Sequence, residues 1–478
     1  MLGYPGPRYP SLRRPKSVEE LMPRARELVS QVGQVDNMSI RQDYSIKAGD
    51  KILWVVLSEY EPMVIEAMCR AIREKGARVD VFTLDSSPVA PPEELAAHEA
   101  IALGKEEGNY SYYYTVICDL IGTNTAKAMA NLEKYSLIIS GSAGLYPAMS
   151  GFRCPWRRFN FTSLEDFAGP FFDSSPELLN LIDKKVYAQV MSCDVLRLTD
   201  PEGTDVKWTN YKDKRRFVSD HIFARSMDLD YLYSGKDDCA GVIAGTTNHM
   251  GAFPHLKAYL EGGQVVKVEG SGKYGDVWRE KIEEYKNVRL PYISHQVTKY
   301  GAMADGLHQP DDSTEGERRQ AVTPGVFLYY ECAIGTIPSI FRNIKEARME
   351  CYANCLHERR RSGVIHNGFG PPITTQQELI EAGLPWVHVH IHCLFATLEG
   401  KVGGKTLTII DKGHLTALDD PEVRLLAKKY GNPDKLLTET WIPALPGINV
   451  PGDYMKDYGR DPISWNKKEA AEHPIWID

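Results

Sequence analysis

Three histidines stand at alternate positions late in the chain, His388, His390 and His392 in the segment WVHVHIHCLF. Alternating polar and apolar residues predict a half-buried β-strand, and on a strand every second residue shares one face. The three imidazoles would therefore project together, where protonated rings would repel one another. Neutral imidazole is the commonest metal ligand in proteins. The spacing indicates a metal site, and the alternative interpretation is a solvent-exposed histidine face.

The segments before this strand predict an α/β fold. A buried strand (KAGDKILWVVL), an amphipathic helix (EPMVIEAMCRAIREKGA) and another strand (RVDVFTL) follow one another. Strand, helix and strand at this spacing imply parallel strands joined by a crossover. We therefore expect an N-terminal arm and first helix over residues 1–35, and an open α/β sheet domain over residues 36–192.

From about Cys193 onwards, short strands and tight turns dominate, including a β-hairpin expected in LEGGQVVKVEG. Residues 193–445 are expected to form a β-rich α+β domain that binds the metal and carries catalysis. A C-terminal tail, residues 446–478, should dock on the body of the protein. An irregular insertion around residues 290–322 is typical of a functional lid or a subunit contact.

Composition narrows the class of protein. The chain has 478 residues, of which 43% are hydrophobic and 25% charged, as in ordinary globular proteins. A net charge of −8 argues against nucleic acid as a partner. The N-terminus lacks the apolar core of a secretory signal, and the apolar runs are too short to span a bilayer. We expect a cytoplasmic protein without a membrane partner, and the Pro-rich arm favours a homo-oligomer.

Several segments, taken in order, resemble signatures of the aminopeptidase T superfamily of metalloenzymes. That superfamily also contains non-haem iron 2,5-dihydroxypyridine 5,6-dioxygenases, which are closest to this chain in their ligand pattern. The similarity covers most of residues 30–415. The segments that carry it are KAGDKILWVVL, IREKGARVDVF, CDVLRLTDPEGTDVKW, AYLEGGQVVKVEG, YYECAIGT, SGVIHNGFG and HIHCLF.

The resemblance implies ligands in the last three of these segments. Glu331, His366, His390 and His392 take the ligand positions, and His392 stands where the superfamily has an aspartate. A register two residues earlier, with His388 and His390 in the last two positions, is also compatible with the sequence. The peptidases take a further glutamate from a P-x-GEvf segment, which has no counterpart here.

These two differences from the superfamily pattern, His392 in place of an aspartate and the missing glutamate, help to decide between two kinds of chemistry. A two-metal hydrolase needs carboxylates that bridge its ions, whereas two histidines and one carboxylate form the facial triad of non-haem Fe(II) oxygenases. Glu331, His390 and His392 would make that triad, with His366 as a fourth ligand or as the acid/base beside it. An all-histidine triad and a mononuclear zinc site are the alternatives.

The expected function is a mononuclear non-haem Fe(II) dioxygenase that cleaves a hydroxylated aromatic or heteroaromatic ring, with a small aromatic substrate and O2 as partners. A metal-dependent aminopeptidase or amidohydrolase is the alternative function, with Zn as the alternative cofactor. A catalytically silent metal-binding scaffold is the third possibility. His366, His388 and Tyr330 are the catalytic candidates. The substrate-binding candidates are Thr247, Asn248 and His249, for which a capped turn is the alternative interpretation.

Overall fold

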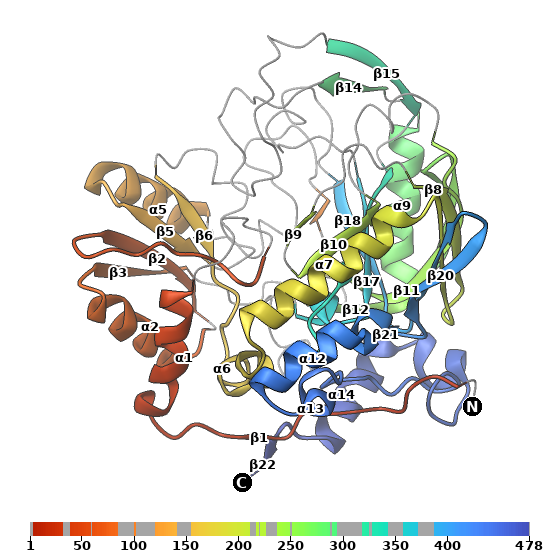
Figure 1. Cartoon of the computed structure of the whole chain (residues 1–478). Coiled ribbons are helices and arrows are strands. Elements are labelled where there is room, and N and C mark those ends of the chain that lie inside the picture. The colour runs from red at the N-terminus through yellow and green to blue at the C-terminus, as the bar shows by residue number, and fades with distance from the viewer. Residues whose placement is uncertain are drawn as a thin grey trace.

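A computed structural model gives the structure of the chain (Figure 1). The structure describes residues 3–31, 39–58, 60–84, 100–101, 120–140, 154–210, 217–218, 220–225, 237–248, 251–286, 289–293, 318–324, 327–342, 357–370 and 387–477. Most of the insertion expected around residues 290–322 lies outside these residues.

The N-terminal part contains a four-stranded parallel sheet with the strand order β3-β2-β5-β6. The strand, helix and strand expected from the sequence are present as β2, α2 and β3. The turn that ends α2 contains Gly76 at a φ of 79°, which glycine adopts without strain. The elements of this part are α1 Val18–Ser30, β2 Lys51–Leu57, α2 Pro62–Glu74, β3 Arg78–Leu84, α5 Leu120–Glu133, β5 Leu137–Ser140, β6 Trp156–Arg158, α6 Leu164–Ala168 and η2 Pro170–Asp173.

A six-stranded sheet carries the histidine strand, with the order β4-β18-β17-β16-β10-β9 and antiparallel neighbours throughout. The strand predicted for the histidine run is confirmed as β18. Its edge partner β4 comes from the segment that we expected inside the N-terminal domain. The strands are β4 Ala100–Ile101, β9 Phe217–Val218, β10 His221–Arg225, β16 Tyr329–Gly335, β17 Ile365–Phe369 and β18 Val387–Cys393.

An eight-stranded antiparallel sheet has the order β13-β12-β11-β8-β7-β19-β20-β21. The expected hairpin is confirmed between β12 and β13, where Gly262 and Gly263 both have positive φ, at 57° and 74°. The strands are β7 Val195–Asp200, β8 Thr204–Thr209, β11 Ala240–Asn248, β12 Gly251–Glu261, β13 Gln264–Gly270, β19 Thr397–Val402, β20 Lys405–Asp411 and β21 His414–Leu415. A parallel sheet with helices plus large antiparallel sheets confirms the expected fold class, whereas the domain boundaries stay predictions.

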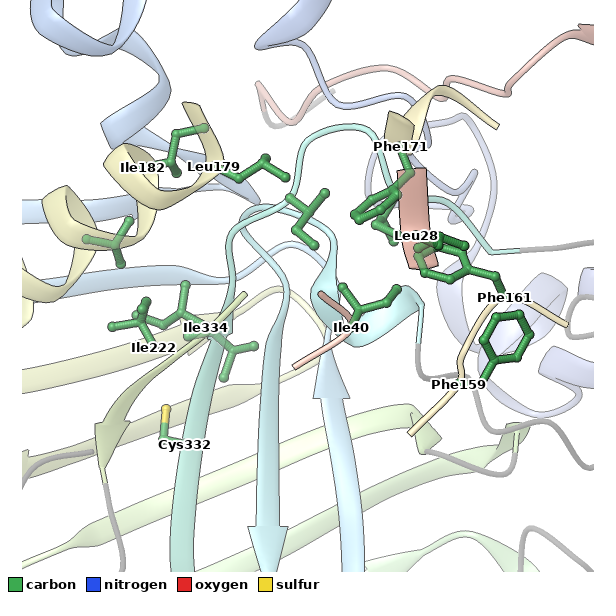
Figure 2. Close-up of a cluster of buried hydrophobic side chains, with 14 of the residues drawn as sticks. Leu28, Ile40, Phe159, Phe161, Phe171, Leu179, Ile182, Ile222, Cys332 and Ile334 are labelled. Atoms are coloured by element: carbon green, nitrogen blue, oxygen red, sulfur yellow. The ribbon is translucent and has the colours of Figure 1, made fainter. Parts of the chain in front are cut away.

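Helix α7, Pro176–Ser192, lies against one face of the six-stranded sheet (Figures 1 and 2). Figure 2 shows Leu179 and Ile182 of this helix near Ile222 of β10 and Ile334 of β16. All four side chains are buried. This face therefore belongs to the hydrophobic core, which leaves the opposite face of the same strands for the polar residues.

The two ends of the chain lie side by side, because β1 (Leu12–Arg13) pairs in parallel with β22 (Trp476–Ile477). Tyr458 in the C-terminal segment packs with Phe395, directly after the histidine strand, in a small apolar cluster. None of the described helices is long and apolar enough to cross a membrane. The remaining elements are α9 Gly272–Tyr285, β14 Arg289–Ile293, β15 Arg318–Pro324, η3 Glu358–Arg360, η4 Thr416–Asp419, α12 Pro421–Tyr430, α13 Pro433–Leu436, η5 Tyr454–Gly459 and α14 Pro462–Glu472.

Candidate metal centre

The histidines of β18 share one face of the six-stranded sheet with an acidic residue of β16. In the antiparallel register, Glu331 lies opposite Gly368, and Gly368 lies opposite His390. Two residues away on the same strands, His366 lies opposite His392. Directly paired residues and residues two apart project from the same face. The register therefore brings one carboxylate and three imidazoles to one side of the sheet.

Two local features make room for the Glu331 side chain on this face. The register shifts between Tyr329 and Glu331, so Tyr330 is the extra residue of a β-bulge, a device that re-aims side chains beside active sites. The facing residue is Gly368, where a Cβ would lie 3.0 Å from the Glu331 Cβ and 3.1 Å from its Oε2. The bulge thus sets the face of Glu331, and the glycine leaves space for its carboxylate beside His390.

Glu331, His366 and His390 each offer a ligand atom, and these atoms all lie within 4.8 Å of one another. Nδ1 of His366 lies 3.6 Å from Oε1 of Glu331, and the ring centroids of His366 and His390 are 4.6 Å apart. All three side chains are buried. The donor set fits a divalent transition-metal ion, because imidazole and carboxylate together suit iron and zinc.

The protonation states of the two imidazoles favour a bound cation. Burial lowers the pKa of His366 well below its usual value, and the charges of His390 and Arg359 lower it further. Burial likewise lowers the pKa of His390, with Arg359 and His392 acting in the same direction. Both rings are therefore neutral at physiological pH, which is the form that binds metal.

His392 lies on the same face but contacts a different carboxylate. Its Nδ1 lies 2.9 Å from Oε1 of Glu358, and its ring centroid lies 5.9 Å from that of His366. Glu358 is fully buried, forms an ion pair with Arg342 at 2.5 Å, and accepts a hydrogen bond from the hydroxyl of Thr247 at 3.1 Å. Although burial raises the pKa of Glu358, Arg342 and His392 lower it to about 2.

The expected trio of Glu331, His390 and His392 therefore differs from the group that the structure brings together. His366, expected as a fourth ligand or acid/base, lies in that group, whereas His392 is next to it and held by Glu358. The sequence pattern could not show whether His366 or His392 lies closer to Glu331, because this depends on the register of β17 against β16. The ligand role of His392 stays a prediction.

Three further residues that were not predicted from the sequence to belong to the site, His221, Glu358 and Arg359, lie near this group. His221 of β10 is buried, lies opposite Gly335, and has its ring centroid 5.8 Å from that of His366. Its strand, HIFAR, is too short for a clear period. Glu358 was hidden in the charged run HERRRSG. Such runs are usually solvated, yet Arg359 is only 2% exposed, and it is close enough to Glu331 for each charge to affect the other.

The other residues predicted to belong to the site lie in different places in the structure. His388 lies in β18, with its backbone opposite Ala100, and its side chain lies outside the described structure. Thr247 is buried and contacts Glu358. The Asn248 side chain accepts a hydrogen bond from the backbone N–H of Gly251 at 3.1 Å, a contact that favours the capped-turn interpretation. His249 lies outside the described residues. The expected roles of these residues, and of buried Tyr330, stay predictions.

Comparison with known proteins finds structural likeness at low sequence identity. No family model and no curated protein matches the sequence. The chain is similar to a 2,5-dihydroxypyridine dioxygenase from Pseudomonas putida KT2440, with a TM-score of 0.43, 12% identity, and coverage of 86% of this chain and 99% of that one. It is also similar to AmpT from Thermus thermophilus, with a TM-score of 0.44, 14% identity, and coverage of 84% and 100%. Both likenesses are at low sequence identity, so the reaction has to be argued from the site itself.

Proposed function

We propose that this protein is a mononuclear non-haem Fe(II) dioxygenase that opens a hydroxylated aromatic or heteroaromatic ring with O2. The observation that carries the proposal is the buried group of one carboxylate and two imidazoles, Glu331, His366 and His390. When bound by such a facial triad, Fe(II) keeps open positions at which a bidentate substrate and O2 can be held together.

The carboxylates around this group favour one metal ion over two. A two-metal hydrolase bridges its ions through carboxylates, and Glu331 is the acidic member of the group among the described residues. The neighbouring Glu358 is engaged by Arg342, Thr247 and His392 instead. A carboxylate fixed by a buried guanidinium is poorly placed to bridge a second ion. This arrangement supports the oxygenase over the aminopeptidase or amidohydrolase alternative.

The residues around the group also favour an anionic substrate. Arg359 is buried beside Glu331, His366 and His390, where it affects the protonation of both imidazoles. A guanidinium in a site from which water is excluded attracts a carboxylate more strongly than one at the surface. The substrate class that fits best is a small hydroxylated aromatic acid, whose hydroxyl would lie toward the metal and whose carboxylate would lie toward the arginine.

The test is an oxygen-electrode assay on protein loaded anaerobically with Fe(II), with small hydroxylated aromatic and pyridine carboxylic acids as substrates. We expect O2 uptake and loss of the aromatic absorbance in the wild-type protein. Both should be absent from Glu331→Gln prepared in the same way, because the variant lacks the anionic ligand. Hydrolysis of a leucyl amide by the zinc-loaded protein, without O2 uptake by the iron-loaded one, would replace the proposal with the hydrolase.

A further inference from the structure

Glu358 is a buried acidic residue beside the metal group, and its contacts come from three separate segments. Arg342 donates to its Oε2 from Nε at 2.6 Å. Thr247 of β11 donates to Oε1, and Nδ1 of His392 lies 2.9 Å from the same oxygen. Because burying a charge is costly unless it is paired and hydrogen-bonded, this full set of partners holds Glu358 as a carboxylate.

The ionised state of Glu358 determines the tautomer of His392. A carboxylate can only accept hydrogen bonds, so the contact requires that Nδ1 of His392 carries the proton. In a neutral imidazole the other nitrogen, Nε2, then holds the lone pair. Glu358 thus leaves Nε2 of His392 with the lone pair that can bind a metal ion, and it fixes the plane of the ring.

The position of His392 is compatible with a place in the metal centre. The centroid of an imidazole that binds through nitrogen lies roughly 3 Å from the ion, so two such centroids lie at most about 6 Å apart. The centroid distances of His366 to His390 and to His392 are 4.6 Å and 5.9 Å, both within that limit. His392 also lies directly opposite His366 in the strand register.

We propose that Glu358 is a positioning residue for the metal centre, which acts by holding His392 so that Nε2 becomes a fourth protein donor beside Glu331, His366 and His390. This inference rests on the proposed metal centre but not on the reaction that it performs. It assigns a pair, Glu358 and His392, in which a carboxylate orients a histidine toward a metal. Loss of such an orienting partner typically costs 10–100-fold in metal affinity.

The test is a Co(II) titration followed by visible absorption, without O2 or substrate, on the wild type, Glu358→Gln, His392→Ala and the double variant. We expect Glu358→Gln to bind Co(II) about 10–100-fold more weakly than the wild type, and His392→Ala, which removes the ligand itself, to bind it at least as weakly as Glu358→Gln. Because Glu358 is proposed to act through His392, Glu358→Gln should cause no further loss in the His392→Ala background. Independent effects would instead multiply in the double variant.

Asp183→Asn is the matched control. Asp183 is as buried as Glu358 and is ion-paired with Arg41, whose side chain is 4% exposed, compared with 6% for Arg342. This control also leaves a buried guanidinium without its anion, but it should keep wild-type Co(II) affinity. Glu358→Asp keeps the charge and should recover part of the affinity, which covers the case in which Glu358→Gln does not fold.

The outcomes separate the two proposals. If the wild-type protein binds Co(II) and both Glu358 variants bind it equally well, the positioning role is wrong and the metal centre stands. The same conclusion follows if the losses multiply in the double variant, or if Asp183→Asn loses as much affinity as Glu358→Gln. If the wild-type protein binds no Co(II), the metal centre itself is wrong and the positioning role falls with it.

Discussion

The two faces of the six-stranded sheet are built from alternate residues of the same strands, and they differ in the polarity of their side chains. One face bears Glu331, His366, His390 and His392, all buried. The other face packs against α7 (Figure 2). It also packs against β11, where Gly245 leaves room for Ile391. Its buried side chains include Ile222, Cys332, Ile334 and Ile391.

We infer from this contrast that alternate residues of one strand can have different roles, one set binding a metal ion and the other stabilising the fold. Side chains on the apolar face add hydrophobic contacts and stabilise the fold. Side chains on the polar face cost free energy when buried, unless they are paired or bind a ligand. Changes on the polar face should therefore affect the metal first, and changes on the apolar face should affect stability first.

The largest expected effect is the loss of metal from His390→Ala. This substitution removes one of the three clustered ligands, and the apolar face that packs β18 into the core remains. We expect metal affinity to fall by more than about a hundredfold, since loss of an orienting partner alone costs 10–100-fold. Metal analysis after desalting measures the loss, and circular dichroism checks that the fold is retained. A variant that keeps stoichiometric metal would remove His390 from the centre.

The reverse experiment is Ile334→Ala on the apolar face. Ile334 is fully buried near α7 (Figure 2), and truncation of a buried isoleucine costs about 2–5 kcal/mol of unfolding free energy. Urea denaturation should show this loss, while the folded fraction binds metal as the wild type does. If Ile334→Ala lost metal without losing stability, the two faces would not be separable as described.

A smaller effect is expected from Gly368→Ala, which tests the packing that places the carboxylate. The new Cβ would lie 3.0 Å from the Glu331 Cβ, so the Glu331 side chain must shift. We expect metal affinity to fall on the order of tenfold with little change in stability. Gly431→Ala, at the end of α12 and outside this sheet, is the control. Unchanged affinity in Gly368→Ala would show that the close approach does not determine the ligand position.

Part of this organisation could be predicted from the sequence. The period of two in WVHVHIHCLF predicted the strand and its shared histidine face, because alternation is a local property. The partner of each histidine could not be predicted, since it depends on strand register and on the bulge at Tyr330. Glu358 and His221 also escaped notice, because a short helical turn and a five-residue strand carry little local signal.

The smallest expected effect concerns pH, and it contrasts two buried glutamates held by adjacent threonines. Thr247 donates to Glu358, which has a cationic partner in Arg342. Glu202 instead accepts hydrogen bonds from the hydroxyl groups of Thr246 and Tyr454. Burial and the charge of Asp200 raise the pKa of Glu202 to about 8, and burial raises that of Asp200 to about 6. Burial alone therefore does not decide the direction of such shifts.

The raised pKa of Glu202 fixes the sign of the pH dependence. Between pH 4.5, the ordinary pKa of the group, and about pH 8, the unfolded chain has released the proton that the folded chain keeps. The contribution of Glu202 to stability should therefore fall as pH rises through this range, against the rise that the lowered pKa values of His366 and His390 contribute up to about pH 6.5. Glu202→Gln should remove this falling contribution, as measured by comparing urea denaturation of the variant and the wild type at several pH values. Some slope should remain above about pH 6.5, because the hydrogen bond to Glu439 raises the pKa of His414 to about 9. An unchanged slope would contradict the assignment to Glu202.

We propose that Glu331, His366 and His390 together bind one iron ion. The metal content of the wild type, Glu331→Gln and His366→Ala, measured after anaerobic incubation with Fe(II) and desalting, tests this directly. We expect one iron per chain in the wild type and little or none in either variant, with the fold retained in all three. Two ions per wild-type chain, no iron in the wild type, or full iron content in the variants would contradict it.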